Sequence, residues 1–137
     1  MAVLFYRPSN NQIAERLQNI IDTELPGGKT EIYQSIEMFS ERLRSPARCG
    51  CIAILLADSA SGLMEMLSIK ELLKDIRIIL VLPNRAIETV STGHKLHPRF
   101  LSYADSDFKD VAAVLRKMIR LVEDSGLVPN QNNAVFN

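Results

Sequence analysis

Residues 51–58 read Cys-Ile-Ala-Ile-Leu-Leu-Ala-Asp and are followed directly by Ser59-Ala-Ser-Gly62. The first seven residues of this run carry no charge. A short apolar run that ends in polar residues and glycine is typical of a strand buried on both faces of a parallel sheet. A second such run, Ile76-Arg-Ile-Ile-Leu-Val-Leu82, ends at Pro83-Asn84. With the helical pattern between them, the two runs predict a β-α-β unit.

The rest of the chain continues the alternation of strand and helix patterns. Further strands are predicted at residues 2–6, 30–33 and 99–103. Helices are predicted from the turn at residues 9–11 to Pro26-Gly-Gly28, from a Ser35 cap to Pro46, from Ser59 to about Lys74, from Arg85 to about Gly93, and from a Ser106 cap to about Val122. Right-handed crossovers then favour a flavodoxin-like (βα)5 fold, a doubly wound parallel sheet with strand order 2-1-3-4-5 in a single α/β domain.

Composition limits the classes of partner. The 137 residues suit one domain, which we place at residues 1–123, with a polar C-terminal tail at 124–137. Sixteen basic residues balance sixteen acidic ones, so charge gives no argument for binding nucleic acid or an acidic membrane. No apolar run approaches the roughly 20 residues that a membrane span needs.

The cysteines and the N-terminus indicate an intracellular setting. Cys49 and Cys51 flank a single glycine, too close for an ordinary disulfide, so both are expected to be reduced thiols in or near the core. Residues 1–6 lack the basic start and the long apolar segment of a signal peptide. We therefore expect a cytoplasmic protein.

Function in doubly wound sheets collects at the carboxyl ends of the strands. The candidate residues for a ligand crevice there are Arg7, Asp58, Ser59, Ser61, Asn84 and Arg85. Asp58 can be read as the N-cap of the helix that follows, as a ligand-binding carboxylate, or as a phosphoacceptor. Ser59-Ala-Ser-Gly62 could hold an anion through backbone N–H groups, but it matches neither glycine-rich nucleotide motif.

Gly93-His-Lys-Leu-His-Pro-Arg99 is the least ordinary polar stretch of the chain. Its two histidines stand beside Lys95 and Arg99, a combination that could bind an anion or titrate near neutral pH. An exposed connection and a partner contact are the other readings. No acidic or cysteine ligand lies nearby in sequence, so a metal site is not expected.

Two helix patterns carry a resemblance to a known family. The third helix begins with Gly62, Leu63 and Leu67, and the last helix carries Phe108, Val111, Val114 and Leu115. With five βα units in this length, residues 1–122 resemble a receiver domain of the two-component response-regulator (CheY-like) superfamily. The resemblance implies signal transduction and a set of catalytic residues. These are two acids ending the first strand, an aspartate ending the third, a Thr or Ser ending the fourth and a Lys ending the fifth.

This sequence departs from that set at most positions. The first strand leads into Arg7-Pro8 without a carboxylate, the fourth leads into Pro83-Asn84, and Tyr103 or Ala104 stands where the lysine belongs. Only Asp58 is of the required kind. We therefore expect a degenerate, pseudo-receiver form: a non-catalytic module that is not an enzyme, has no metal or cofactor, and does not use aspartyl phosphorylation.

Such a module would act through protein–protein contact. The resemblance places the contact surface on the fourth helix, fifth strand and fifth helix, with a protein partner of unstated identity or a second copy forming a homodimer. The candidate surface residues are Arg85, Glu88, His94, His97, Arg99, Lys109, Arg116 and Arg120. The alternatives are a small-molecule or anion-binding domain using the strand-end crevice, and an atypical receiver phosphorylated at Asp58.

Overall fold

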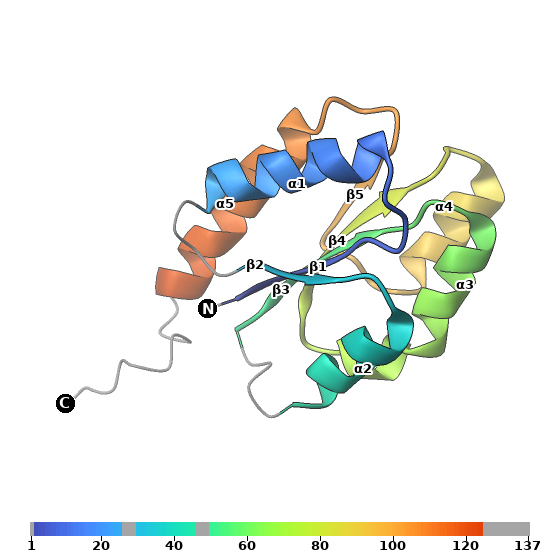
Figure 1. Ribbon diagram of the computed structural model, residues 1–137, viewed down its shortest axis with the longest axis horizontal. Helices are drawn as coiled ribbons and strands as arrows, with labels where there is room; N and C mark the ends of the chain where they lie inside the picture. The colour runs from blue at the N-terminus through green and yellow to red at the C-terminus, as the bar shows by residue number, and fades with distance from the viewer. Residues whose placement is uncertain (1, 26–29, 46–49, 125–137) are drawn as a thin grey trace.

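One sheet of five parallel strands runs through the centre of the computed structural model, which describes residues 2–25, 30–45 and 50–124 (Figure 1). The strands are β1 (Val3–Tyr6), β2 (Thr30–Tyr33), β3 (Ile52–Leu56), β4 (Arg77–Leu82) and β5 (Phe100–Tyr103), in the order β2-β1-β3-β4-β5. The helical elements are α1 (Gln12–Glu24), α2 (Ile36–Arg44), α3 (Ala60–Ser68), η2 (Lys70–Leu73), α4 (Ile87–His94) and α5 (Lys109–Asp124). The predicted flavodoxin-like fold and strand order are confirmed.

Burial along the strands follows their position in the sheet. Every residue of β3, the central strand, is buried, as the uncharged run predicted. The edge strands β2 and β5 are mostly half-buried. An apolar strand in the middle of a parallel sheet is covered by helices on both faces, whereas an edge strand needs a more polar sequence.

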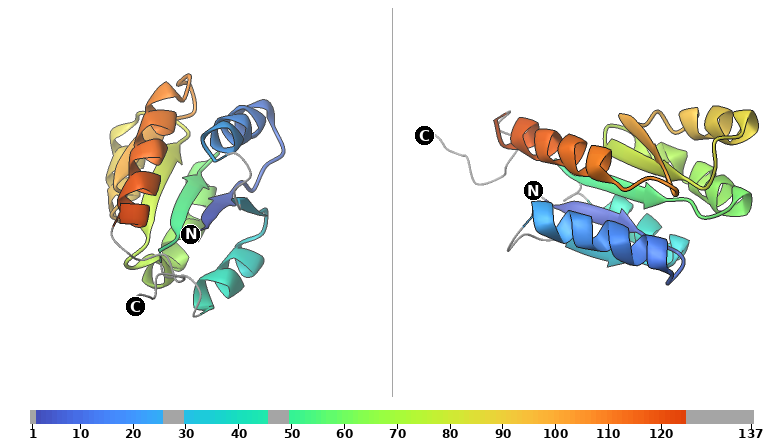
Figure 2. Two further views of the ribbon diagram at one scale, coloured as in Figure 1. Left: turned by 90° about the vertical axis from the view of Figure 1, so that its left-hand side faces the viewer. Right: turned by 90° about the horizontal axis from the view of Figure 1, so that it is seen from above.

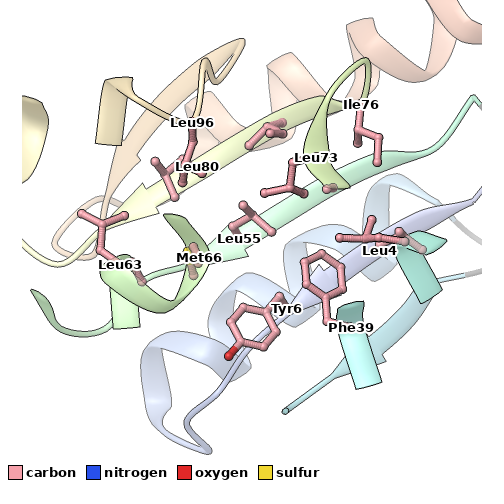
Figure 3. Close-up of a cluster of buried hydrophobic side chains, with 14 of the residues drawn as sticks. Leu4, Tyr6, Phe39, Leu55, Leu63, Met66, Leu73, Ile76, Leu80 and Leu96 are labelled. Atoms are coloured by element: carbon pink, nitrogen blue, oxygen red, sulfur yellow. The ribbon is translucent and has the colours of Figure 1, made fainter. Parts of the chain in front are cut away.

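The helices cover the two faces of the sheet as separate layers. Helices α1 and α5 pack on one face through a core cluster that includes Leu17, Ile21 and Leu115. Figure 2 shows these two helices along the same side of the sheet. Helices α2, α3 and α4 and the turn η2 cover the other face, where Leu4, Tyr6, Phe39, Leu55, Leu63, Met66, Leu73, Ile76, Leu80 and Leu96 form the cluster shown in Figure 3.

Two arginines link α1 with α5 and with the segment that leads into α5. Arg16 donates to the Ser106 carbonyl at 2.6 Å, and its guanidinium lies 5.0 Å from the centroid of the Phe108 ring. Arg116 forms a two-pronged pair with Glu24 at 2.9 and 2.8 Å. The hydrogen bonds from Arg116 hold the pKa of Glu24 below its ordinary value. These contacts fix the angle between the two helices across the sheet.

Glycine at position 93 allows α4 to lie close to the sheet. A Cβ there would stand 3.2 Å from methyl carbons of both Leu80 and Leu82 on β4. A larger side chain would have to push the helix or these leucines away.

The third helix is shorter than predicted. The sequence pattern favoured one helix from Ser59 to about Lys74, but α3 ends at Ser68 and the chain continues as the 3-10 turn η2. The Ser68 hydroxyl donates to the Glu65 carbonyl at 2.5 Å, and this carbonyl is the one that an α-helical Ile69 N–H would use. The Ile69 N–H bonds to the Met66 carbonyl instead, which tightens the chain into 3-10 geometry.

The cap predicted for the last helix was wrong. Ser106 accepts a hydrogen bond from the Phe108 N–H at 2.8 Å, which closes a turn before the helix. Phe108 then adopts a left-handed backbone, with φ of 64°, while its ring is fully buried. Because that conformation cannot belong to an α-helix, α5 starts only at Lys109.

Several sequence predictions lie outside the described residues: the Pro26-Gly28 helix end, the stop at Pro46, Cys49, and the tail from residue 125 onward. Cys51 is a buried thiol, and burial raises its pKa. Over the part of the chain that the structure describes, no helix has both the length and the apolar character needed to cross a bilayer.

Candidate functional site

A small crevice lies where β1, β3, β4 and β5 end. Its volume is about 140 Å³, and it is lined by Asn11, Ile13, Leu56, Asp58, Pro83 and Ala104. Strand order reverses between β1 and β3, and ligands of doubly wound sheets bind at such a switch point. Typical ligand pockets have volumes of about 300–1,000 Å³. This crevice is therefore small for anything beyond a single compact group.

Asp58 stands at the rim of the crevice and is exposed. Its carboxylate accepts a hydrogen bond from the hydroxyl of Ser9, in the loop that leaves β1. Reading Asp58 as the cap of α3 was wrong. The cap is Ser59, whose hydroxyl accepts the Gly62 N–H at 3.0 Å. An N-cap side chain accepts the N–H of the residue three positions later, and Ser59, not Asp58, stands three positions before Gly62.

Replacing the cap tests this assignment. Ser59→Ala is expected to lower the free energy of unfolding by about 1 kcal/mol, because the Gly62 N–H loses its acceptor. Ser61→Ala and Asp58→Ala should each stay within about 0.5 kcal/mol, since both side chains are exposed and neither caps the helix. Urea denaturation of the three variants measures the difference. A larger loss for Asp58→Ala than for Ser59→Ala would contradict the assignment.

Arg7 does not line the crevice. Its side chain is only 6% exposed and donates to Asn10 Oδ1, in the loop before α1, at 2.7 Å and to Glu15 Oε2, in α1, at 2.8 Å. Arg7 Nη1 also donates a longer hydrogen bond to Gln18 Oε1, at 3.4 Å. Sequence reasoning placed the Arg7 charge near the strand-end site and missed these partners. Glu15 and Gln18 lie three residues apart in α1, so they share a face of the helix.

Asn84 and Arg85 belong to a separate cluster beside the crevice. Asn84 Oδ1 accepts the Ala86 N–H at 3.0 Å, which forms the turn that starts α4. The Arg85 guanidinium lies 4.0 Å from the centroid of the Tyr103 ring and pairs with Asp105 at 3.0 Å. Of the six residues predicted for the crevice, the structure places only Asp58 in its lining.

The crevice residues do not fit the Mg²⁺ site that the receiver resemblance implies. A hard cation of this kind is held by carboxylates with added carbonyl or water oxygens. Among the described residues of the lining, Asp58 is the one carboxylate, and Ile13, Leu56, Pro83 and Ala104 supply apolar surface. Within residues 2–25, 30–45 and 50–124, no three His, Cys, Asp or Glu side chains gather closely enough to hold a metal ion.

All eight residues predicted for the partner surface are exposed, but they do not share one face. Arg116 lies on the side of α5 that faces α1, where it pairs with Glu24. His97 and Arg99 line a cleft at the amino ends of β4 and β5. Arg85 and Glu88 lie at the opposite end, around the start of α4. The charge pattern alone did not reveal this division.

Comparisons with known proteins bear on the fold. Neither a scan against protein-family models nor a search of curated proteins finds a match. Among solved structures, the chain is similar to a fusion protein carrying the trimeric coiled coil of yeast Spc42, with a TM-score of 0.66 and 14% identity over 96% of this chain and 84% of that one.

A second solved structure is more informative. It is the signal receiver domain of a modulated diguanylate cyclase from Desulfovibrio desulfuricans G20, with a TM-score of 0.59 and 13% identity. The match covers 90% of this chain and 97% of that one. At this level of identity the likeness shows a shared receiver-like fold.

Proposed function

We propose that this protein is a receiver-like signalling module that is not an enzyme, does not accept a phosphoryl group at Asp58, and acts by contact with another protein. The fold shared with a signal receiver domain supports the signalling role. The lining of the strand-end crevice carries the non-catalytic part of the proposal. It offers one carboxylate and otherwise mainly apolar side chains where phosphoryl transfer needs a metal and a cation.

The crevice residues also argue against the other two readings. An atypical receiver phosphorylated at Asp58 would need groups that neutralise the phosphoryl oxygens, yet Arg7 is turned toward Glu15 and Ala104 stands at the end of β5. A small-molecule binder at this end would need more volume than about 140 Å³.

The start of α4 is the contact surface that we propose. Ile87 is 85% exposed at the first position of this helix, between Arg85 and Glu88. An exposed isoleucine flanked by charges of both signs gives an apolar anchor with a polar rim, which is the usual anatomy of a protein interface. With no phosphoryl group to switch it, the surface would respond only to a partner or ligand that prefers one conformation.

Beryllofluoride, a phosphoryl mimic, tests the non-catalytic claim. Uniformly ¹⁵N-labelled protein is titrated with Mg²⁺ and beryllofluoride, with Mg²⁺ and fluoride alone as the control. We expect the amide signals of residues 56–62 to stay unchanged. Saturable shifts centred on Asp58 that vanish in Asp58→Ala would overturn the proposal. A dilution series of the same sample reports self-contact, because a homodimer through α4 would shift the Ile87 signal with concentration.

A further inference from the structure

A larger cleft lies at the opposite end of the sheet from Asp58. Its volume is about 460 Å³, and it opens between η2, the amino ends of β4 and β5, and the segment that follows α4. This volume falls within the range of small-molecule sites. The basic residues that line it are Lys70, Lys74, Arg77, Lys95, His97 and Arg99.

The cleft concentrates positive charge in a chain that is neutral overall. Of the residues that the structure describes, five lysines and arginines line it, against the two carboxylates of Glu71 and Asp75. Lys74 lies 3.7 Å from Glu71. Among the described residues, the other four cations have no ion-pair partner. The neutral charge of the whole chain does not account for this local excess of positive charge, whereas a bound anion would neutralise it.

Arg77 adds an unsatisfied donor to the cleft. Its Nε atom is buried and has no hydrogen-bond partner among the described residues. Buried N–H groups are almost always paired in folded proteins, and a molecule bound in the cleft would supply the acceptor that this donor lacks. Arg99 stands at the same end of the neighbouring strand, where its N–H donates to the Ile78 carbonyl at 2.8 Å, and it also lines the cleft.

Two residues of the lining have an unusual backbone conformation. Asp75 and His97 have left-handed backbones, with φ of 65° and 53°, and each follows the end of a helical element. Glycine is the residue that adopts this conformation most easily at such a position. Both positions instead carry polar side chains that line the cleft.

Three buried apolar side chains also contribute to the lining of the cleft. Leu73, Ile76 and Leu96 line it and also belong to the buried cluster of Figure 3. A ligand that combines anionic groups with an apolar body would contact both kinds of lining residue. A phosphate group satisfies guanidinium donors with paired acceptors, and a nucleobase or a similar flat ring supplies the apolar part.

We propose that this cleft binds a small phosphate-bearing molecule of the nucleoside diphosphate type, with Arg77, Lys95 and Arg99 as its phosphate-binding residues. The site is independent of the proposed function at the other end of the sheet. Its use does not require any chemistry at Asp58.

Titration of the ¹⁵N-labelled full chain with ADP, inorganic pyrophosphate and adenosine tests the proposal at an ionic strength of about 0.15 M. ADP and pyrophosphate should give saturable shifts at residues 70–77 and 95–99, and adenosine should not saturate. The double variant Lys95→Gln, Arg99→Gln should weaken ADP binding by about tenfold or more, because it removes two charge-assisted contacts. The matched control Lys117→Gln, Arg120→Gln neutralises exposed residues of α5 and should leave ADP affinity within about twofold.

Three outcomes would overturn the site. Shifts that stay linear and spread over the surface would show non-specific counterion binding. Equal affinity of the cleft variant and the wild type, with native circular dichroism for both, would place ADP elsewhere. Saturable binding of hexaglutamate without any binding of ADP or pyrophosphate would assign the cleft to an acidic protein segment.

Discussion

Phe39→Ala is expected to lower the free energy of unfolding by about 3–5 kcal/mol, the largest loss of any single change that we predict. Phe39 is fully buried on α2, and its ring stacks on that of Tyr6 at a centroid distance of 5.2 Å and an interplanar angle of 13°. The Phe39 ring also contacts the Tyr33 ring, at a centroid distance of 5.7 Å. Truncation therefore removes apolar burial and leaves a cavity between α2 and the sheet.

Met38→Ala is the matched control, because Met38 is the neighbouring residue of the same helix and is 62% exposed. This control should change the free energy of unfolding by no more than about 0.5 kcal/mol. Urea denaturation at neutral pH measures both. A loss below about 1.5 kcal/mol for Phe39→Ala would mean that α2 collapses onto the sheet without a cavity, or that it contributes little to the folded state.

The fold was predictable from the sequence because its strongest signals are local. The uncharged run at residues 52–56 is buried at every position, and Ser35 and Asn11 cap α2 and α1 through their own side chains. The errors occurred at helix ends, where a side chain bonds to a backbone group. Ser68 takes the Glu65 carbonyl and ends α3 early, a competition that apolar spacing does not record.

The candidate sites were harder to predict, because they depend on where long side chains turn. Because Arg7 follows the first strand, the sequence predicted that its side chain would line the crevice. Its pairing with Glu15 depends on where α1 packs on the sheet, which the sequence pattern does not give. The basic cleft draws on residues 70–77 and 95–99, which meet through the pairing of β4 and β5. His97 and Arg99 stood out in the sequence, but Arg77 appeared there only as a charge inside an apolar strand.

Alkaline pH is expected to destabilise the protein through Tyr6, and Tyr6→Phe should remove that effect. Burial, with added repulsion from Glu65, Asp58 and Glu37, raises the pKa of Tyr6 from 10.0 to about 12. A group whose pKa is higher in the folded state stabilises that state below the unfolded pKa, and this contribution is lost as pH rises toward the folded pKa. Between pH 9 and pH 11, ionisation of Tyr6 should therefore lower the free energy of unfolding of the wild type by on the order of 1 kcal/mol.

Urea denaturation at pH 9 and pH 11 measures this cost, and absorbance at the tyrosinate band follows ionisation directly. Over this range the free energy of unfolding of Tyr6→Phe should fall by on the order of 1 kcal/mol less than that of the wild type. Tyr33→Phe is the informative comparison, because burial also raises the pKa of Tyr33 to about 12, yet its hydroxyl donates to Glu31 at 2.7 Å. The free energy of unfolding of Tyr33→Phe should already be about 1 kcal/mol below that of the wild type at pH 9, since this variant loses a hydrogen bond to a charged acceptor. If wild type and Tyr6→Phe declined in parallel, the Tyr6 hydroxyl would have to reach solvent in the folded state, and the packing of Tyr6 against Phe39 would be looser than its 2% exposure indicates.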